Sequence, residues 1–196
     1  MKKFLFVMAA GLALGSCSSN TEAEKEAAVV ANYTLDVENS KLEWVGSKKI
    51  ADYAHNGEIY FTAGTVETID GVIANGNFTV DMNSIKVTDA TPDDKKPYLE
   101  GHLKNEDFFN TTSFPAAEVT IGEYKDGKLA TTVKLLGVEY KQDVAVNATV
   151  TEDKVVLKGD FNFNFDGIKS AGFMVGEDGE QIKPEVAFKL HAELKK

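Results

Sequence analysis

Histidine and acidic side chains are the residues of this chain that could carry out catalysis or bind a metal ion, and they are widely scattered. No two of the three histidines, His55, His102 and His191, have the spacing of a metal-binding pair. The sequence contains no Gly-x-Ser-x-Gly element, phosphate-binding loop or dinucleotide fingerprint. His102 lies close to Glu100 and Asp107, so an acid–base pair is one interpretation, and a structural or solvated histidine is the simpler one. We therefore predict no catalytic residue and no metal site.

Charge and composition narrow the class of protein further. The chain has 196 residues, is 43% hydrophobic and carries a formal net charge of −10 at pH 7. That length favours one globular domain with a sizeable core. A strong negative charge repels phosphate backbones, so a nucleic-acid partner is not expected.

The first residues have the pattern of an export signal. Two lysines are followed by an apolar run of 11 residues, from Phe4 to Leu14, which is too short to span a bilayer. Cys17 comes directly after Leu-Gly-Ser and is the one cysteine of the chain, so it has no partner for an internal disulfide. This Leu-Gly-Ser-Cys segment resembles a bacterial lipobox, which implies lipidation of Cys17. The alternative is an ordinary signal peptide with an incidental cysteine.

These features predict how the chain is divided and where it resides. Residues 1–16 are expected to be a signal peptide, residues 17–32 a lipidated N-terminus with an acidic, flexible tether, and residues 33–196 the folded domain. We expect an exported protein held at the cell envelope by its lipid anchor, at the outer membrane and facing the periplasm.

From Tyr33 onward the chain reads as a series of β-strands. Apolar and polar residues alternate through segments such as Ile59-Tyr60-Phe61-Thr62-Ala63 and 161–165, and tight-turn dipeptides at Asp70-Gly71 and Asp126-Gly127 separate strand-like runs. The pattern predicts an all-β fold of about eight or nine antiparallel strands, either a closed barrel or a sandwich.

One segment departs from the strand pattern. Tyr98, Leu99, His102 and Leu103 recur at helical spacing, and the Phe108-Phe109 pair follows. We expect a short helix whose apolar face, together with these two rings, covers one end of the β-structure as a lid.

The same segment carries a resemblance to a known family. Gly101-His-Leu-Lys-Asn-Glu-Asp-Phe-Phe, followed by Phe114-Pro115 and preceded by Val80-Asp-Met-Asn-Ser-Ile, resembles the YceI-like family. The resemblance covers the chain from about Tyr33 to Leu194. It implies an antiparallel, lipocalin-like β-barrel of about eight strands around a long apolar cavity that holds a polyisoprenoid or a similar amphiphile.

The residues alone leave the interior of the barrel undecided. An eight-stranded barrel is wide enough either to be filled by side chains or to hold one ligand, and by itself the sequence favours a filled core. The resemblance favours a cavity. We then expect the cavity to be lined by aromatic residues from several strands and from the end of the helix: Trp44, Phe61, Phe78, Phe108, Phe109, Phe161, Phe163, Phe165 and Phe188.

The expected function is therefore binding of a long-chain isoprenoid or a similar amphiphilic lipid by a membrane-anchored carrier or buffer that is not an enzyme. No cofactor is expected, and the bound compound would be a polyisoprenoid or a quinone-like lipid. Two alternatives stay open: an enzyme or stress factor that acts on such a lipid, and a filled barrel that serves as an interaction domain. A homodimer is also left open.

Overall fold

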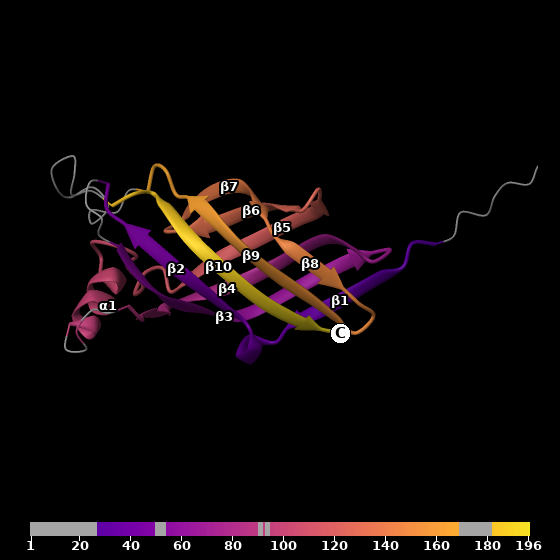
Figure 1. Cartoon of the computed structure of the whole chain (residues 1–196), viewed down its shortest axis with the longest axis horizontal. Helices are drawn as coiled ribbons and strands as arrows, with labels where there is room; N and C mark the ends of the chain where they lie inside the picture. Colours follow the sequence, from indigo (N-terminus) through magenta and orange to yellow (C-terminus); the bar gives the residue numbers. More distant parts are fainter. Residues whose placement is uncertain (1–26, 50–53, 90–91, 93–94, 169–181) are drawn as a thin grey trace, which may run out of the picture.

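The computed structural model describes residues 27–49, 54–89, 92, 95–168 and 182–196, which form an antiparallel β-barrel with one short α-helix at its end (Figure 1). The elements, in chain order, are β1 (Val30–Leu35), the 3-10 turn η1 (Val37–Asn39), β2 (Lys41–Ser47), β3 (Ala54–Ile69), β4 (Val72–Val87), α1 (Lys96–Lys104), β5 (Ala116–Lys125), β6 (Lys128–Leu135), β7 (Val138–Ala145), β8 (Asn147–Val150), β9 (Lys154–Asn164) and β10 (Glu185–Lys195). The all-β barrel predicted from the sequence is confirmed.

Eight of the strands form the closed circuit. β2 pairs with β3 on one side and β10 on the other, β3 continues through β4, β5 and β6 to β7, and β10 pairs with β9. The circuit closes between β7 and β9 through the side chain of Gln142 on β7. This side chain donates to the Asn162 carbonyl at 2.6 Å and accepts from the Asn164 amide at 3.1 Å. β8 adds to β9, and β1 fills the gap between β3 and β10 at one end.

Tight turns with positive φ angles set the register of the hairpins. Asp70-Gly71 and Asp126-Gly127 have φ angles between 51° and 78° and join β3 to β4 and β5 to β6, as the sequence predicts. Leu136-Gly137 forms a third turn of this kind, between β6 and β7. Leu136 has a φ of 52°, which is rare for a leucine, so the sequence did not indicate it as a turn residue.

Some strand boundaries differ from the predicted ones. β1 begins at Val30, three residues before the predicted domain boundary. β7 and β8 are separated at Val146, and the alternating segment 161–165 is the last part of a longer strand, β9, which begins at Lys154 and ends at Asn164. The strict alternation predicted through Ala63 is wrong, because the register of β3 shifts between Phe61 and Ala63 and leaves Ala63 exposed.

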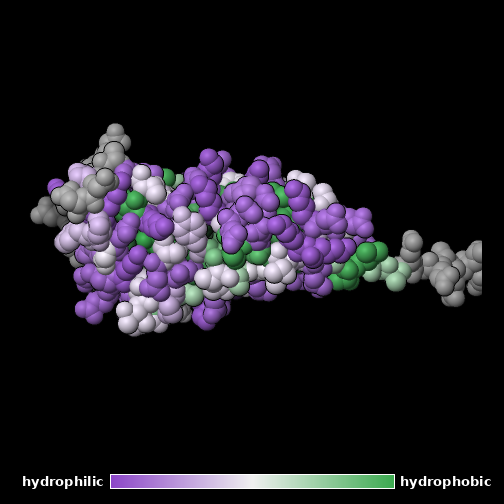
Figure 2. Space-filling view, turned by 90° about the horizontal axis from the view of Figure 1, so that it is seen from below, coloured by the Kyte–Doolittle hydropathy of each residue, from purple (hydrophilic) through white to green (hydrophobic). Residues whose placement is uncertain are grey.

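The two ends of the barrel are packed differently. Val66, Ile73, Val155 and Leu194 are fully buried at the end where β1 begins, and the Tyr33 hydroxyl there donates to the Thr151 carbonyl at 2.9 Å. α1 lies at the opposite end (Figure 1). The outer face seen in Figure 2 is mostly hydrophilic, so the apolar residues of the strands point inward.

Candidate functional site

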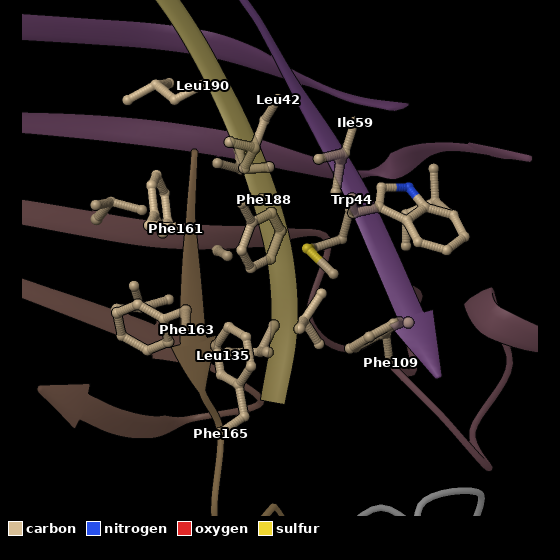
Figure 3. Close-up of a pocket in the computed structure, with 18 of the residues that line it drawn as sticks. Leu42, Trp44, Ile59, Phe109, Leu135, Phe161, Phe163, Phe165, Phe188 and Leu190 are labelled. Carbon is tan, nitrogen blue, oxygen red and sulfur yellow. The ribbon is translucent and has the colours of Figure 1, made fainter. Parts of the chain in front are cut away.

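Between α1 and the packed end, the barrel contains an apolar cavity of about 720 Å³. This volume falls within the range of about 300–1,000 Å³ that is usual for small-molecule sites. All nine aromatic residues predicted from the sequence line it: Trp44, Phe61, Phe78, Phe108, Phe109, Phe161, Phe163, Phe165 and Phe188. Figure 3 shows six of them, Trp44, Phe109, Phe161, Phe163, Phe165 and Phe188. Their binding of a lipid stays a prediction.

Partial exposure of inward-facing side chains shows that the interior is hollow. Leu42, Val119, Val133 and Leu190 all line the cavity, and each is only partly buried. At the opposite end, inward residues such as Val66 have no exposed surface at all. Since protein cores are normally close-packed, this contrast separates the filled end of the barrel from the open part.

Aromatic rings from β9, from β10 and from Phe165, the residue directly after β9, form a continuous section of the wall. The centroids of Phe163 and Phe165 are 4.8 Å apart, those of Phe161 and Phe188 are 5.9 Å apart, and Phe165 meets Phe188 edge-on at 6.3 Å. Figure 3 shows these four side chains turned toward the interior. Such rings supply a large apolar surface with few conformational states.

Two glycines make room for rings on the other side of the cavity. A Cβ atom on Gly64 would lie 2.5 Å from Cδ1 of Phe78, and one on Gly57 would lie 2.6 Å from Cζ2 of Trp44. The Trp44 indole also donates to the Glu58 carbonyl at 3.3 Å. These contacts fix the orientation of both rings in the wall.

α1 and the turn after it supply one end of the cavity wall. Leu99, Leu103, Phe108 and Phe109 line the cavity, and the Glu100 carboxylate accepts a hydrogen bond of 2.8 Å from the Val87 amide, which ties α1 to the end of β4. The predicted helix with its pair of rings is thus present at one end of the barrel.

The position of one residue in this segment was predicted wrongly. The sequence placed Tyr98 on the apolar face of the helix, but this side chain is 78% exposed. Its ring lies beside His102, with the centroids 6.3 Å apart, on the solvent side. A tyrosine tolerates this position because its hydroxyl remains hydrated.

Polar side chains gather at the rim of the cavity near α1. Ser47, Lys48, His55, His102 and Asp107 line this end. Thr131 also lines the cavity, and its hydroxyl donates to the Leu129 carbonyl at 3.0 Å, so its donor is already satisfied. The cavity is therefore apolar along its length and polar at one mouth, which suits an amphiphile.

His55 and Asp89 form a hydrogen-bonded pair at this rim that was not predicted from the sequence. Nδ1 of His55 lies 2.8 Å from Oδ2 of Asp89, and the same carboxylate oxygen accepts from the Asn56 amide at 3.2 Å. Hairpin register could have revealed the pair. Gly57 lies opposite Val87, so residues two positions farther out on each strand also face each other.

The acid–base interpretation of His102 finds little support in the geometry. Glu100 is turned toward the Val87 amide, and Nδ1 of His102 lies 3.3 Å from the side-chain amide of Asn105. Within the described residues, no group of three His, Cys, Asp or Glu side chains could hold a metal ion, and no helix is long and apolar enough to cross a membrane.

The aliphatic part of the lining was not predicted from the sequence. Leu42, Ile59, Val80, Met82, Ile85, Val119, Ile121, Leu129, Val133, Leu135, Val144, Leu157, Val186 and Leu190 belong to it. No local signal separates an inward aliphatic residue that faces a cavity from one that fills a core.

The predicted signal peptide and the predicted lipidation at Cys17 lie outside the described residues.

Comparisons with known proteins agree with this architecture. Residues 33–194 match the family model of the YceI-like domain. The comparison with curated proteins yields no match. A polyisoprenoid binding domain from Saccharophagus degradans superposes with a TM-score of 0.61 at 15% identity, over 83% of this chain and 97% of that one. BcnA from Burkholderia cenocepacia gives a TM-score of 0.61 at 18% identity, over 81% and 98% of the two chains.

Proposed function

We propose that this chain, which belongs to the YceI-like family, binds a long-chain isoprenoid or a similar amphiphilic lipid inside its barrel. The observation that carries the proposal is the apolar cavity of about 720 Å³ with polar side chains collected at one mouth. The Saccharophagus degradans protein of similar fold is described as a polyisoprenoid binding domain, which supports the same ligand class.

The energetics of an apolar cavity are sufficient for useful affinity. Burial of each methylene group of a ligand contributes about 0.8 kcal/mol, so ten such groups contribute about 8 kcal/mol before the cost of ordering the ligand is subtracted. A hydrocarbon tail makes no directional bonds with the lining. Selectivity for the tail then follows from the length and width of the cavity.

We also propose that the protein is a carrier attached to the envelope through a lipid on Cys17, at the outer membrane and facing the periplasm. β1 begins at Val30, thirteen residues after Cys17, so a fully extended tether reaches about 45 Å at most. The chain enters the barrel at its packed end, and α1 lies at the other end (Figure 1). The polar mouth would therefore point away from the anchoring membrane.

Titration of the lipid-free protein tests the binding proposal. Trp44 is the single tryptophan of the chain and lines the cavity, so its fluorescence reports on ligand uptake. Saturable binding of a long isoprenoid, and weaker binding of a short one, would support the proposal. An unchanged Trp44 signal, together with no retained lipid in native mass spectrometry, would contradict it.

Fractionation tests the anchor. Wild-type protein should sediment with membranes, and Cys17→Ala should be released from them or remain unprocessed. A soluble wild-type protein with an unmodified N-terminus would rule the anchor out.

A further inference from the structure

One buried tyrosine hydroxyl near the cavity has no hydrogen-bond partner among the residues that the structure describes. Tyr140 on β7 is 7% exposed, and its Oη makes no hydrogen bond with any part of the described chain. The hydroxyls of three other tyrosines all donate: Tyr33 to the Thr151 carbonyl, Tyr60 to Glu58, and Tyr124 to the Val146 carbonyl. A buried, unsatisfied hydroxyl destabilises a folded protein, so its retention calls for a physical reason.

The position of Tyr140 relates it to the cavity wall. Tyr140 lies opposite Val133 on β6, and residues that face each other on antiparallel strands project to the same side of the sheet. Val133 lines the cavity, so Tyr140 also points inward. Its ring meets the ring of Phe165 edge-on, with the centroids 5.3 Å apart, and Phe165 lines the cavity. Tyr140 therefore lies one side chain behind the cavity surface.

Backbone contacts place this part of the wall at the polar mouth. The Phe165 amide donates to the Pro184 carbonyl at 2.9 Å, and the neighbouring Lys183 amide donates to the Ser47 carbonyl at 2.8 Å. Ser47 belongs to the polar rim. Phe165 is thus close to the end of the cavity where the head group of an amphiphile would lie, and Figure 3 shows its ring beside Phe163 and Leu135.

The chemistry of the hydroxyl defines what it could bind. Burial raises the pKa of Tyr140 above its usual value, so the phenol is protonated at neutral pH and can donate a hydrogen bond. A carbonyl or ether oxygen can accept that bond. A pure hydrocarbon cannot.

We propose that the Tyr140 hydroxyl donates a hydrogen bond to a carbonyl or ether oxygen in the head group of the bound isoprenoid, which reaches it past the edge of the Phe165 ring. The inference rests on the proposed function and assigns Tyr140 as the residue that selects for an oxygen atom in the head group of the isoprenoid. The Tyr140 hydroxyl, unsatisfied in the lipid-free protein, then increases the affinity for a ligand whose head group accepts a hydrogen bond, and so favours it over a hydrocarbon.

Two probes and two matched variants test this inference. Squalene is an isoprenoid hydrocarbon, and geranylgeranylacetone is an isoprenoid ketone. Tyr140→Phe removes the unsatisfied hydroxyl, and Tyr33→Phe removes a buried hydroxyl that is already bonded, at the packed end of the barrel. Thermal melts of the lipid-free full chain and Trp44 fluorescence titrations are measured for wild type and both variants.

The two variants should change the melting temperature in opposite directions. Tyr140→Phe should raise the melting temperature by roughly 2–4 °C, weaken binding of the ketone roughly three- to ten-fold and leave binding of squalene unchanged. Tyr33→Phe should lower the melting temperature and leave both affinities unchanged, because Tyr33 lies at the packed end of the barrel and its hydroxyl is bonded to the Thr151 carbonyl.

Two outcomes would overturn the role of Tyr140 and leave the proposed function standing. The first is a lower melting temperature for Tyr140→Phe, which would show that the hydroxyl is bonded in the lipid-free protein. The second is a Tyr140→Phe protein that binds the ketone as tightly as wild type. Failure of wild type to bind either probe would contradict the proposed function itself, and the inference with it.

Discussion

Replacement of Val119 by phenylalanine should block the cavity and leave the barrel folded. Val119 lies in the middle of β5, lines the cavity and is only partly buried although it faces inward. The larger ring adds about four carbon atoms to a space that the ligand would otherwise fill. With about 0.8 kcal/mol for each displaced methylene group, the ligand loses about 3 kcal/mol, which corresponds to binding roughly 100–200-fold weaker.

The assay is a Trp44 fluorescence titration with a long-chain isoprenoid, matched by thermal melts. Thr120→Phe is the control, because Thr120 follows Val119 on the same strand, is exposed and points to the outer face. This control should bind as wild type does. Since overpacking can cost about 1–3 kcal/mol, the melts establish that the Val119→Phe protein is folded. A folded Val119→Phe protein that binds the isoprenoid as tightly as wild type would refute the assignment of this cavity as the lipid site.

Three further predictions concern the wall, the lid and the packed end. Phe163→Trp should weaken isoprenoid binding and lower stability by about 1–3 kcal/mol, because Phe163 lines the cavity and is 2% exposed; unchanged titrations and melts would contradict this. Replacement of both Phe108 and Phe109 by alanine should lower the free energy of unfolding by at least about 3 kcal/mol, and a wild-type urea midpoint would show that the rings contribute no packing. The hydrogen bond from Lys195 holds the pKa of Asp36 at about 2, below its unfolded value, so this pair stabilises the fold above about pH 4 and its contribution is lost as the pH falls through 2. Asp36→Asn should therefore be less stable than wild type at neutral pH, and the difference in urea titrations should shrink as the pH falls toward 2; a difference at pH 2 as large as that at neutral pH would exclude this cause.

The fold could be predicted from the sequence wherever neighbouring residues alone determine the backbone conformation. The Asp-Gly turns at residues 70–71 and 126–127 require positive φ angles that few other dipeptides adopt, so they located two hairpins correctly. Leu136 adopts the same conformation because strands β6 and β7 on either side impose it. Pattern reading also cannot detect the register shift near Ala63, because a bulge depends on the partner strand as much as on its own residues.

The site could be predicted only in part. Large rings at alternating positions, such as Phe161 and Phe163, indicate that the barrel has a wide apolar interior, and these residues do line the cavity. Whether an interior is filled depends on the sum of all inward side chains around the barrel, which is a property of the closed circuit. The rim pair of His55 and Asp89 depends on strand register, and the unsatisfied hydroxyl of Tyr140 depends on the atoms around it.

A crystal structure of the chain bound to a long-chain isoprenoid tests the central claim most directly. The account predicts continuous ligand density within the barrel, with the tail against Phe161 and Phe188 and the oxygenated head group toward the rim that holds His55. A ligand bound on the outer surface, or a barrel whose interior is closed by its own side chains, would contradict it.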